Sequence, residues 1–171
     1  MQPTFRPLHE VLSIDVALET LDAMVSGKQQ FDRLAVAQID DLLRSLPDER
    51  ADEKLVQGLL AVYRLSHMHT LRAHAAPAIL KAVRWARRLD NRPLLAKALS
   101  NRAAFASDNY DLAVALEAML EALKIGMEVS DPHRTAVCYI NLSVSMRRLG
   151  RYRAAYACLD AAQVRLKKIL T

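Results

Sequence analysis

The chain has 171 residues, a hydrophobic fraction of 52%, a charged fraction of 25% and a formal net charge of +5. This composition excludes a disordered chain, and 4 Gly and 6 Pro are too few for the many turns of an all-β fold. No apolar run approaches the ~20 residues that span a bilayer, and the N-terminus lacks a signal peptide pattern. We therefore expect a cytoplasmic protein with one domain, and two reduced cysteines, Cys138 and Cys158.

The apolar pattern predicts an all-α fold of eight helices in four hairpins, and the first two hairpins cover about 8–46 and 51–90. In the first, apolar residues at helical spacing predict helices over Val11–Val25 and Asp32–Ser45, and the second of these is expected to turn Ala35, Ile39, Leu42 and Leu46 inward. In the second, one helix covers Ala51–Met68 and the next ends near Leu89. Pro77 leaves two possibilities for that last helix, which either begins near Ala75 or carries a kink in an earlier turn.

The third and fourth hairpins cover about 93–130 and 134–170. Helices are expected over Pro93–Ala106 and Tyr110–Val129. In the last hairpin, Tyr139, Leu142, Met146 and Leu149 share one helical face, and Ala155, Leu159, Ala162, Leu166 and Ile169 share another. Gly150 lies between these two patterns, where a helix ends at little cost in a left-handed residue. A repeat is visible, because Asn141 follows Asn101 by 40 residues, although Tyr152 follows Tyr110 by 42.

The last hairpin carries a family resemblance. Its residues Tyr139, Asn141, Leu142, Ser143, Gly150, Tyr152, Ala155, Leu159 and Ala162 have the spacing of the tetratricopeptide repeat signature, with departures at Ser143, Met146 and Leu159. The period near 40 exceeds the usual value of about 34. It resembles the long repeats of bacterial regulatory proteins, such as the N-terminal sensory regions joined to GGDEF domains. The resemblance implies a right-handed α-solenoid with a concave groove lined by the first helix of each pair.

The resemblance also implies a set of groove residues. In peptide-binding members of the family, an Asn at the position of Asn141 holds the ligand's main chain, and basic residues nearby hold a carboxylate. The expected groove residues are Val137, Ile140, Asn141, Val144, Arg147 and Arg148, with Lys97, Asn101 and Arg102 in the third hairpin and Lys54, Gln57 and Arg64 in the second. The alternatives are a packing or capping role for Asn141, and exposed helix-end cations for Arg147 and Arg148.

The sequence shows no constellation that predicts catalysis, a metal or a cofactor. It lacks a Gly-rich phosphate loop, a nucleophile elbow and paired-cysteine or His-Glu-x-x-His zinc patterns. The histidines His67, His69 and His74 do not pair at i, i+4, so polar residues near a turn are the better interpretation. We therefore expect a non-catalytic scaffold that binds a protein or peptide, as a sensory or regulatory module of a larger bacterial signalling protein.

The charge distribution supports an alternative function. Residues 1–55 hold 11 acidic and 6 basic side chains, whereas residues 56–171 hold 8 acidic and 18 basic side chains. A nucleic-acid-associated or transcription-regulating module could use this basic part through Arg84, Arg87, Arg88, Arg147, Arg148, Arg151 and Arg153. Aromatic residues form only 5% of the chain and mostly occupy predicted core positions, which disfavours single-strand stacking. The last helix lacks a polar cap, so we expect that the chain either continues in a longer protein or buries this face in a homodimer.

Overall fold

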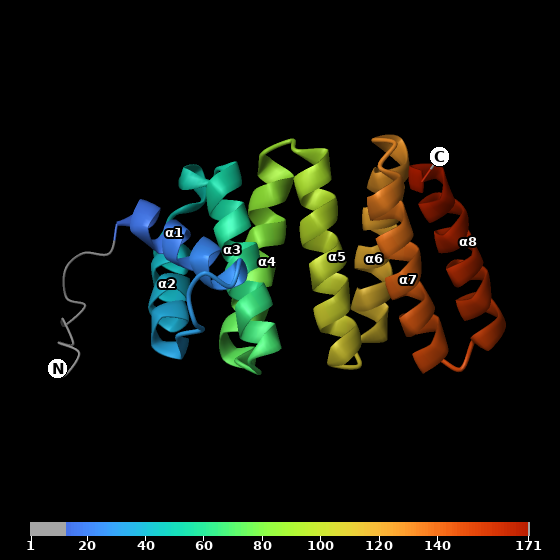
Figure 1. The fold of residues 1–171 in the computed structure, drawn as a ribbon, viewed down its shortest axis with the longest axis horizontal. Helices are drawn as coiled ribbons and strands as arrows, with labels where there is room; N and C mark the ends of the chain where they lie inside the picture. The colour runs from blue at the N-terminus through green and yellow to red at the C-terminus, as the bar shows by residue number, and fades with distance from the viewer. Residues whose placement is uncertain (1–12, 171) are drawn as a thin grey trace.

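The computed structural model describes residues 13–170, which form eight α-helices and one short 3-10 helix, with no strand in that range. Helices α2 to α8 follow one another along the long axis of the molecule in chain order, and α1 lies across α2 and α3 at one end (Figure 1). They are α1 (Ile14–Val25), α2 (Arg33–Ser45), η1 (Asp48–Arg50), α3 (Glu53–Met68), α4 (Arg72–Arg88), α5 (Arg92–Asp108), α6 (Leu112–Glu128), α7 (Pro132–Arg148) and α8 (Tyr152–Leu170). The expected all-α class is confirmed, while residues 8–12 of the predicted first hairpin lie outside the described range.

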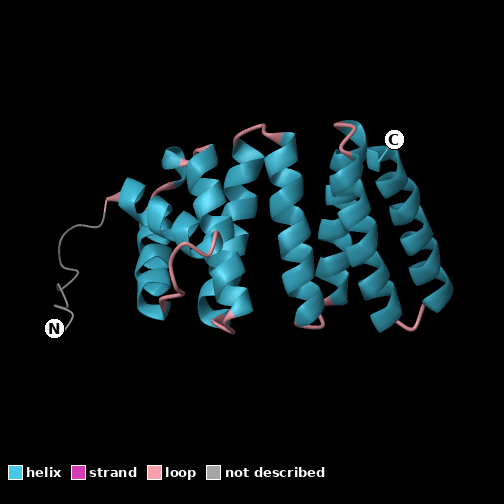
Figure 2. Cartoon of the chain, viewed as in Figure 1, coloured by secondary structure: helices cyan, strands magenta, loops and turns pink. Residues whose placement is uncertain are grey.

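Neighbouring helices pack in pairs, joined by short loops (Figure 2). The pairs α3–α4, α5–α6 and α7–α8 make the most extensive contacts, and α4 packs on α5 as α6 packs on α7. Helices two places apart in the chain also touch. Helix α5 contacts both α3 and α7, and α1 contacts α3. The first helices of successive pairs therefore form one continuous side of the molecule.

The turns recur at a constant interval of 20 residues. A left-handed residue closes each of the last five turns, at Thr70, Asp90, Tyr110, Ser130 and Gly150. Helices α4 to α8 begin at positions 72, 92, 112, 132 and 152. The period of the hairpin is therefore 40, and the 42-residue comparison of Tyr110 with Tyr152 was misaligned. Tyr110 is the turn residue that corresponds to Gly150, and Leu112 corresponds to Tyr152.

Helix starts are fixed by side-chain caps. Asn91 accepts a hydrogen bond from the Leu94 N–H at 3.0 Å, and Asp131 accepts one from the Arg134 N–H at 2.8 Å. Each cap is followed in the first helical turn by a proline, which has no N–H to leave unpaired. These caps place the start of α5 one residue before the predicted Pro93 and the start of α7 at Pro132.

The structure decides where α4 begins and corrects the predicted buried face of α2. Helix α4 begins at Arg72 and contains Pro77, so the earlier start applies and the Ala75 start does not. In α2 the inward face is centred on Val36, Ile39 and Leu43, whereas the predicted Ala35, Leu42 and Leu46 are only half-buried. The buried face of α2 is shifted because α2 contacts both α3 and α4, which the periodicity of a single helix does not reveal.

Buried polar side chains of α4 hold the end of α2. The Lys81 ammonium donates to the carbonyl oxygens of Arg44 at 2.7 Å and Leu46 at 2.6 Å, which are the acceptors left open where α2 stops. The Trp85 indole N–H donates to the Asp48 carboxylate at 2.6 Å, and Trp85 is fully buried. These contacts join residues 35 to 37 positions apart and fasten the first hairpin to the second.

Candidate functional site

A cavity of about 640 Å³ lies among α1, α3 and α5. Five of the twelve predicted groove residues line it, namely Lys54, Gln57, Arg64, Lys97 and Asn101. The structure therefore brings together the predicted residues of the second and third hairpins. The other seven do not line this cavity.

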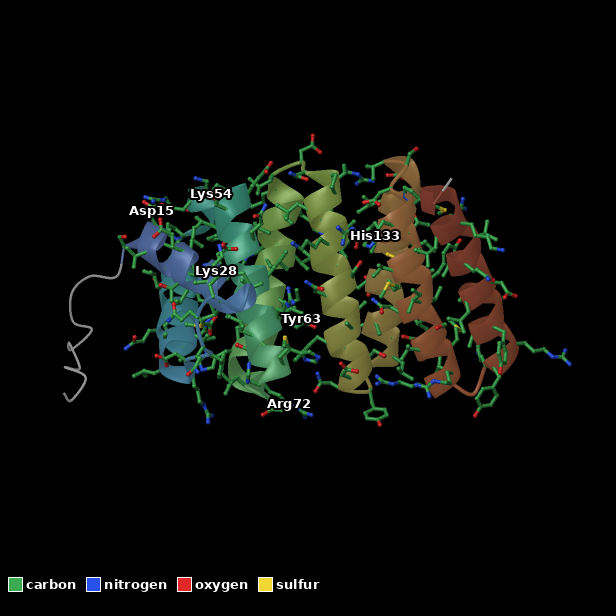
Figure 3. The ribbon with its side chains drawn as sticks, in the orientation of Figure 1. Asp15, Lys28, Lys54, Tyr63, Arg72 and His133 are labelled. Atoms are coloured by element: carbon green, nitrogen blue, oxygen red, sulfur yellow. The ribbon has the colours of Figure 1, made fainter. Side chains whose placement is uncertain are left out.

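Helical spacing explains why these side chains converge. Lys54, Gln57 and Arg64 stand at i, i+3 and i+10 of α3, which places them along one face, and Figure 3 shows Lys54 with Tyr63 on this helix. Lys97 and Asn101 stand at i and i+4 of α5, again on one face. Because α3 and α5 touch each other, their two polar faces open onto the same space.

The cavity carries a positive charge that the protein leaves unpaired. Among the described residues, Lys54, Arg64 and Lys97 have no ion-pair or hydrogen-bond partner, and all three are exposed. Asp22 is the acidic residue in the lining, so three cations and one anion give a balance of +2. Unpaired cations beside a partly enclosed surface attract acidic groups more strongly than scattered surface charges do.

Two side-chain amides add hydrogen-bonding capacity to this charge. Gln57 and Asn101 have no hydrogen-bond partner within the described part of the chain. An amide group both donates and accepts, so each could pair with the N–H and C=O groups of an extended main chain. Asn101 is half-buried, which limits its orientations and favours a defined contact.

Apolar side chains form the remaining wall of the cavity. Leu18 of α1 lies over Gly58 of α3, where a Cβ added to the glycine would collide with the Leu18 Cδ2 methyl group. Gly58 therefore permits the close approach of the two helices, and a larger residue would displace the Leu18 side chain. Ala61 and Ala104 continue this wall. The result is an apolar surface bordered by cations and amides.

A polar chain runs from the cavity across the ends of α3, α5 and α7. His67 lines the cavity and its Nε2 lies 3.2 Å from the Asp108 carboxylate, which also pairs with the Arg148 guanidinium at 2.9 Å. Arg148 further donates to the hydroxyl of Ser107 at 2.8 Å and to its carbonyl oxygen. Arg148, predicted to line the groove, is therefore bound to the end of α5 in this structure.

Tyr63 forms part of the same wall and is held in a protonated state. Its ring meets Phe105 edge-on at 6.2 Å between centroids. Burial, with the nearby Asp108 charge, raises the pKa of Tyr63 to about 12. The hydroxyl group is therefore a neutral donor or acceptor at physiological pH.

The predicted residues of α7 occupy a separate surface. Asn141 is half-buried, follows Asn101 by one period of 40 residues, and has no hydrogen-bond partner for its side chain in the described range. Ile140 is 40% exposed, Arg147 is exposed, and Val137 and Val144 are half-buried. Arg102 of α5 does not line the cavity, and its Nε is buried without a hydrogen-bond partner in the described part of the chain.

Sequence reasoning missed the contribution of α1. Leu18, Leu21, Asp22 and Val25 line the cavity, although the first hairpin has no repeat signature. The spacing of Leu18, Leu21 and Val25 by three and four residues identified an apolar face, but it could not show that the edge of this face borders a cavity. Tyr63 was also missed because it fits a packing role, and His67 was interpreted as a polar residue near a turn.

A cluster of possible metal ligands lies outside the cavity. Single ligand atoms of Asp40, Asp41 and His74 fall within 4.8 Å of one another. However, Arg44 already contacts both carboxylates, at 3.0 Å to Asp40 and 2.8 Å to Asp41, and His74 Nδ1 lies 2.7 Å from Asp40. Burial raises the pKa of Asp40, and the contacts with His74 and Arg44 oppose that shift. We interpret the cluster as an internal ion-pair network that fastens α2 to α4.

Ion pairs engage most of the arginines considered for nucleic acid. Arg84 and Arg88 contact Asp48, and Arg87 contacts Glu121 at 2.6 Å. With Arg148 bound to Asp108, the members of this set that have no partner among the described residues are Arg147, Arg151 and Arg153. These three lie at the α7–α8 turn, far from the α4 set in the chain.

No protein-family model matches this chain, and no curated protein is similar to it in sequence. Within the described residues, no helix is long and apolar enough to cross a membrane. The assignment of a function therefore depends on the residues of the cavity.

Proposed function

We propose that this chain is a non-catalytic scaffold of tetratricopeptide-like repeats that binds an extended acidic segment of a protein in the cavity among α1, α3 and α5. The observation that carries this proposal is the set of unpaired cations, Lys54, Arg64 and Lys97, beside an apolar wall. In this proposal the hairpins form a right-handed solenoid whose concave side contains the cavity. The contacts among α1, α3, α5 and α7 support that arrangement.

The chemistry of the lining favours an extended peptide over a small molecule. The lining includes residues from Lys54 to Met68 of α3 and from Lys97 to Ala104 of α5, so that a chain segment could lie across Lys97, Asn101 and Gln57. The amides would hold main-chain groups, and the cations would hold acidic side chains or a terminal carboxylate. Because the lining residues stand on packed helices, little conformational entropy is lost on binding.

The biological setting follows from the resemblance of the last hairpin. We propose a sensory or regulatory module of a larger bacterial signalling protein, in which binding at the cavity is passed along the helix stack. The polar chain His67–Asp108–Arg148 links the cavity to α7 and offers a physical connection between the two regions.

Binding of a fluorescein-labelled peptide tests the proposal. The probe is a ten-residue peptide of alternating Glu and Leu with a free C-terminal carboxylate, followed by fluorescence anisotropy. We expect the variants Lys97→Glu and Asn101→Ala to weaken its binding about tenfold and fivefold, because they remove a charged and a neutral contact. The matched control is Lys124→Glu, which makes the same charge change at an exposed position of α6.

Two further probes distinguish peptide binding in the cavity from the nucleic-acid alternative. A peptide in which Lys replaces Glu should not bind, and a labelled oligothymidine should bind no better than the acidic peptide. If Lys97→Glu and Lys124→Glu weaken the acidic peptide equally, the cavity is not the binding site. Tight oligothymidine binding that falls steeply with salt and depends on Arg151 and Arg153 would instead support the nucleic-acid alternative.

A further inference from the structure

We propose that the cavity among α1, α3 and α5 selects a segment in which two acidic residues stand four positions apart, with an apolar residue midway between them. This inference deepens the proposed function and rests on it, because it specifies which acidic segments the same cavity binds. The cations of the lining occupy separate levels along α3 and α5, and the distance between those levels sets the spacing of the acids in the ligand.

Lys54 and Arg64 stand at the two ends of the cavity wall that α3 provides. Both are exposed, and neither has an ion-pair or hydrogen-bond partner among the described residues. Their Cα atoms are ten residues apart in the helix, which corresponds to about 15 Å along its axis. Figure 3 shows Lys54 near the start of α3 and Tyr63, the neighbour of Arg64, farther along it. The two cations therefore offer separate contacts to two acidic groups.

The 40-residue period gives the level of the third cation, Lys97. Three pairs of lining residues stand 40 positions apart in α3 and α5, namely Gln57 with Lys97, Ala61 with Asn101, and Arg64 with Ala104. Helices α3 and α5 run in the same direction and contact each other, so paired residues lie at similar levels (Figure 1). Lys97 therefore lies nearer to the level of Lys54, and about 10 Å from that of Arg64 along the helices.

Between the two cationic levels the wall is apolar and carries an amide. Leu60 and Ala61 of α3 lie in this part of the lining, and Leu18 of α1 covers Gly58. Asn101 stands at the level of Ala61, is half-buried, and has no hydrogen-bond partner in the described range. A ligand that lies along α3 therefore meets a positive charge at each end and an apolar surface with one amide in the middle.

An extended main chain matches these levels when its acids are four residues apart. Residues i and i+4 of such a chain are separated by about 13 Å and point to the same side, with residue i+2 midway between them. That distance falls within the range of about 10 to 15 Å between the cationic levels. Separations of two and six residues span about 7 and 20 Å, and a separation of three turns the second acid to the opposite side.

The α1 side of the cavity disfavours an acid that is turned away from α3 and α5. Asp22 of α1 is the acidic residue of the lining, and it has no ion-pair partner in the part of the chain that the structure describes. Its carboxylate repels a second carboxylate placed beside it. Both acids of the ligand must therefore face the two cationic helices, which requires an even separation.

Isothermal titration calorimetry of the full chain with four unlabelled peptides tests the spacing. The nine-residue peptides have blocked ends and the same composition of two Glu, three Leu and four Thr, with the Glu residues two, three, four or six positions apart and a Leu between them. We expect the peptide with a separation of four to bind at least about fivefold more tightly than the others, because only it meets both cationic levels. Arg64→Gln should reduce this preference below about twofold, whereas the control Lys124→Gln on α6 should keep it.

Single Glu→Gln changes in the peptide with a separation of four show which acid meets which cation. Each Glu should couple to a different cation, so that one change has no further effect in Lys54→Gln and the other has none in Arg64→Gln. Both substitutions replace exposed, unpaired side chains, so packing is kept. If the two protein variants silence the same Glu, or neither Glu, the proposed spacing is wrong.

The failure of this inference is distinguishable from the failure of the proposed function. If Lys97→Glu weakens all four peptides and Lys124→Glu weakens none, the cavity binds acidic segments; equal affinities, or a preference for another separation, would then overturn the spacing alone. If none of the peptides binds, or if the two lysine variants weaken them equally, the proposed function and the spacing inference are both overturned.

Discussion

Replacing Lys81 with methionine should destabilise the fold by about 2–3 kcal/mol, because Lys81 closes the end of α2 from within α4. Its ammonium donates to two carbonyl oxygens, those of Arg44 and Leu46, and lies 4.5 Å from the centroid of the Trp85 ring. The residue is only 6% exposed. Methionine is close to lysine in length and apolar volume, so the substitution removes the charge and the donors while largely keeping the packing.

The expected loss of stability in Lys81→Met is the balance of three effects. Two partly buried carbonyl groups lose a charged donor, at about 1–3 kcal/mol each, and the cation–π contact with Trp85 contributes about 1 kcal/mol more. Against this, burial disfavours the ammonium and lowers the pKa of Lys81, so its removal relieves a desolvation cost. For a chain of this size, a net loss of 2–3 kcal/mol lowers the melting temperature by roughly 5–10 °C.

Urea unfolding followed by the fluorescence of Trp85 measures this loss, and a thermal scan by circular dichroism checks it. Lys124→Met is the matched control, because Lys124 is exposed and should change stability by less than about 0.5 kcal/mol. A Lys81→Met variant as stable as this control would refute the reasoning. It would mean that water satisfies the end of α2 and that α4 does not cap it.

Two other predictions concern pH and the turns. Burial raises the pKa of Tyr63 from 10.0 to about 12, so between these values the unfolded chain loses the phenol proton while the folded chain keeps it. The free energy of unfolding is therefore unaffected by this group below pH 10 and falls as the pH rises from 10 toward 12. Urea unfolding between pH 9 and 11.5 should therefore show a loss of about 1–2 kcal/mol that Tyr63→Phe abolishes, and an unchanged slope in that variant would contradict the assignment. In the turns, Gly150→Ala should cost about 1 kcal/mol because Gly150 has a φ of 71°, while Ser130→Gly, at a φ of 53°, should add about 0.5 kcal/mol. Thermal melting measures both, and equal melting temperatures for the two variants would show that the left-handed turns are not strained.

The sequence predicted the helices well because each signal is local. Apolar spacing, Asp and Asn caps and prolines in the first turn all act within a few residues, so the helix ends fell within a few residues of prediction. The shift in α2 had a non-local cause, since its inward face depends on contacts with α3 and α4. Tyr110 misled the alignment because a large aromatic residue at a φ of 61° is an uncommon choice for a turn.

The candidate site was predictable only where the repeat register held. Lys97 and Asn101 were found by counting back 40 residues from the last hairpin, and the register extends well enough to α3 to include Lys54 and Gln57. The contacts of Arg148 could not be predicted, because counting along a helix cannot reveal that Ser107 and Asp108 of another helix engage its guanidinium. The α1 residues of the cavity escaped prediction for the same reason.

The constant interval of 20 residues between left-handed turns has an evolutionary consequence. Inserting a single residue within a helix would rotate everything beyond it by about 100° and break its packing. An in-frame duplication of residues 92–131 would instead supply a helix pair of matching length, whose closing Asp131 takes the capping place of Asn91. A gene for this architecture can therefore grow or shrink by whole modules while every junction keeps its geometry, and the span of the surface available to ligands changes in the same discrete steps.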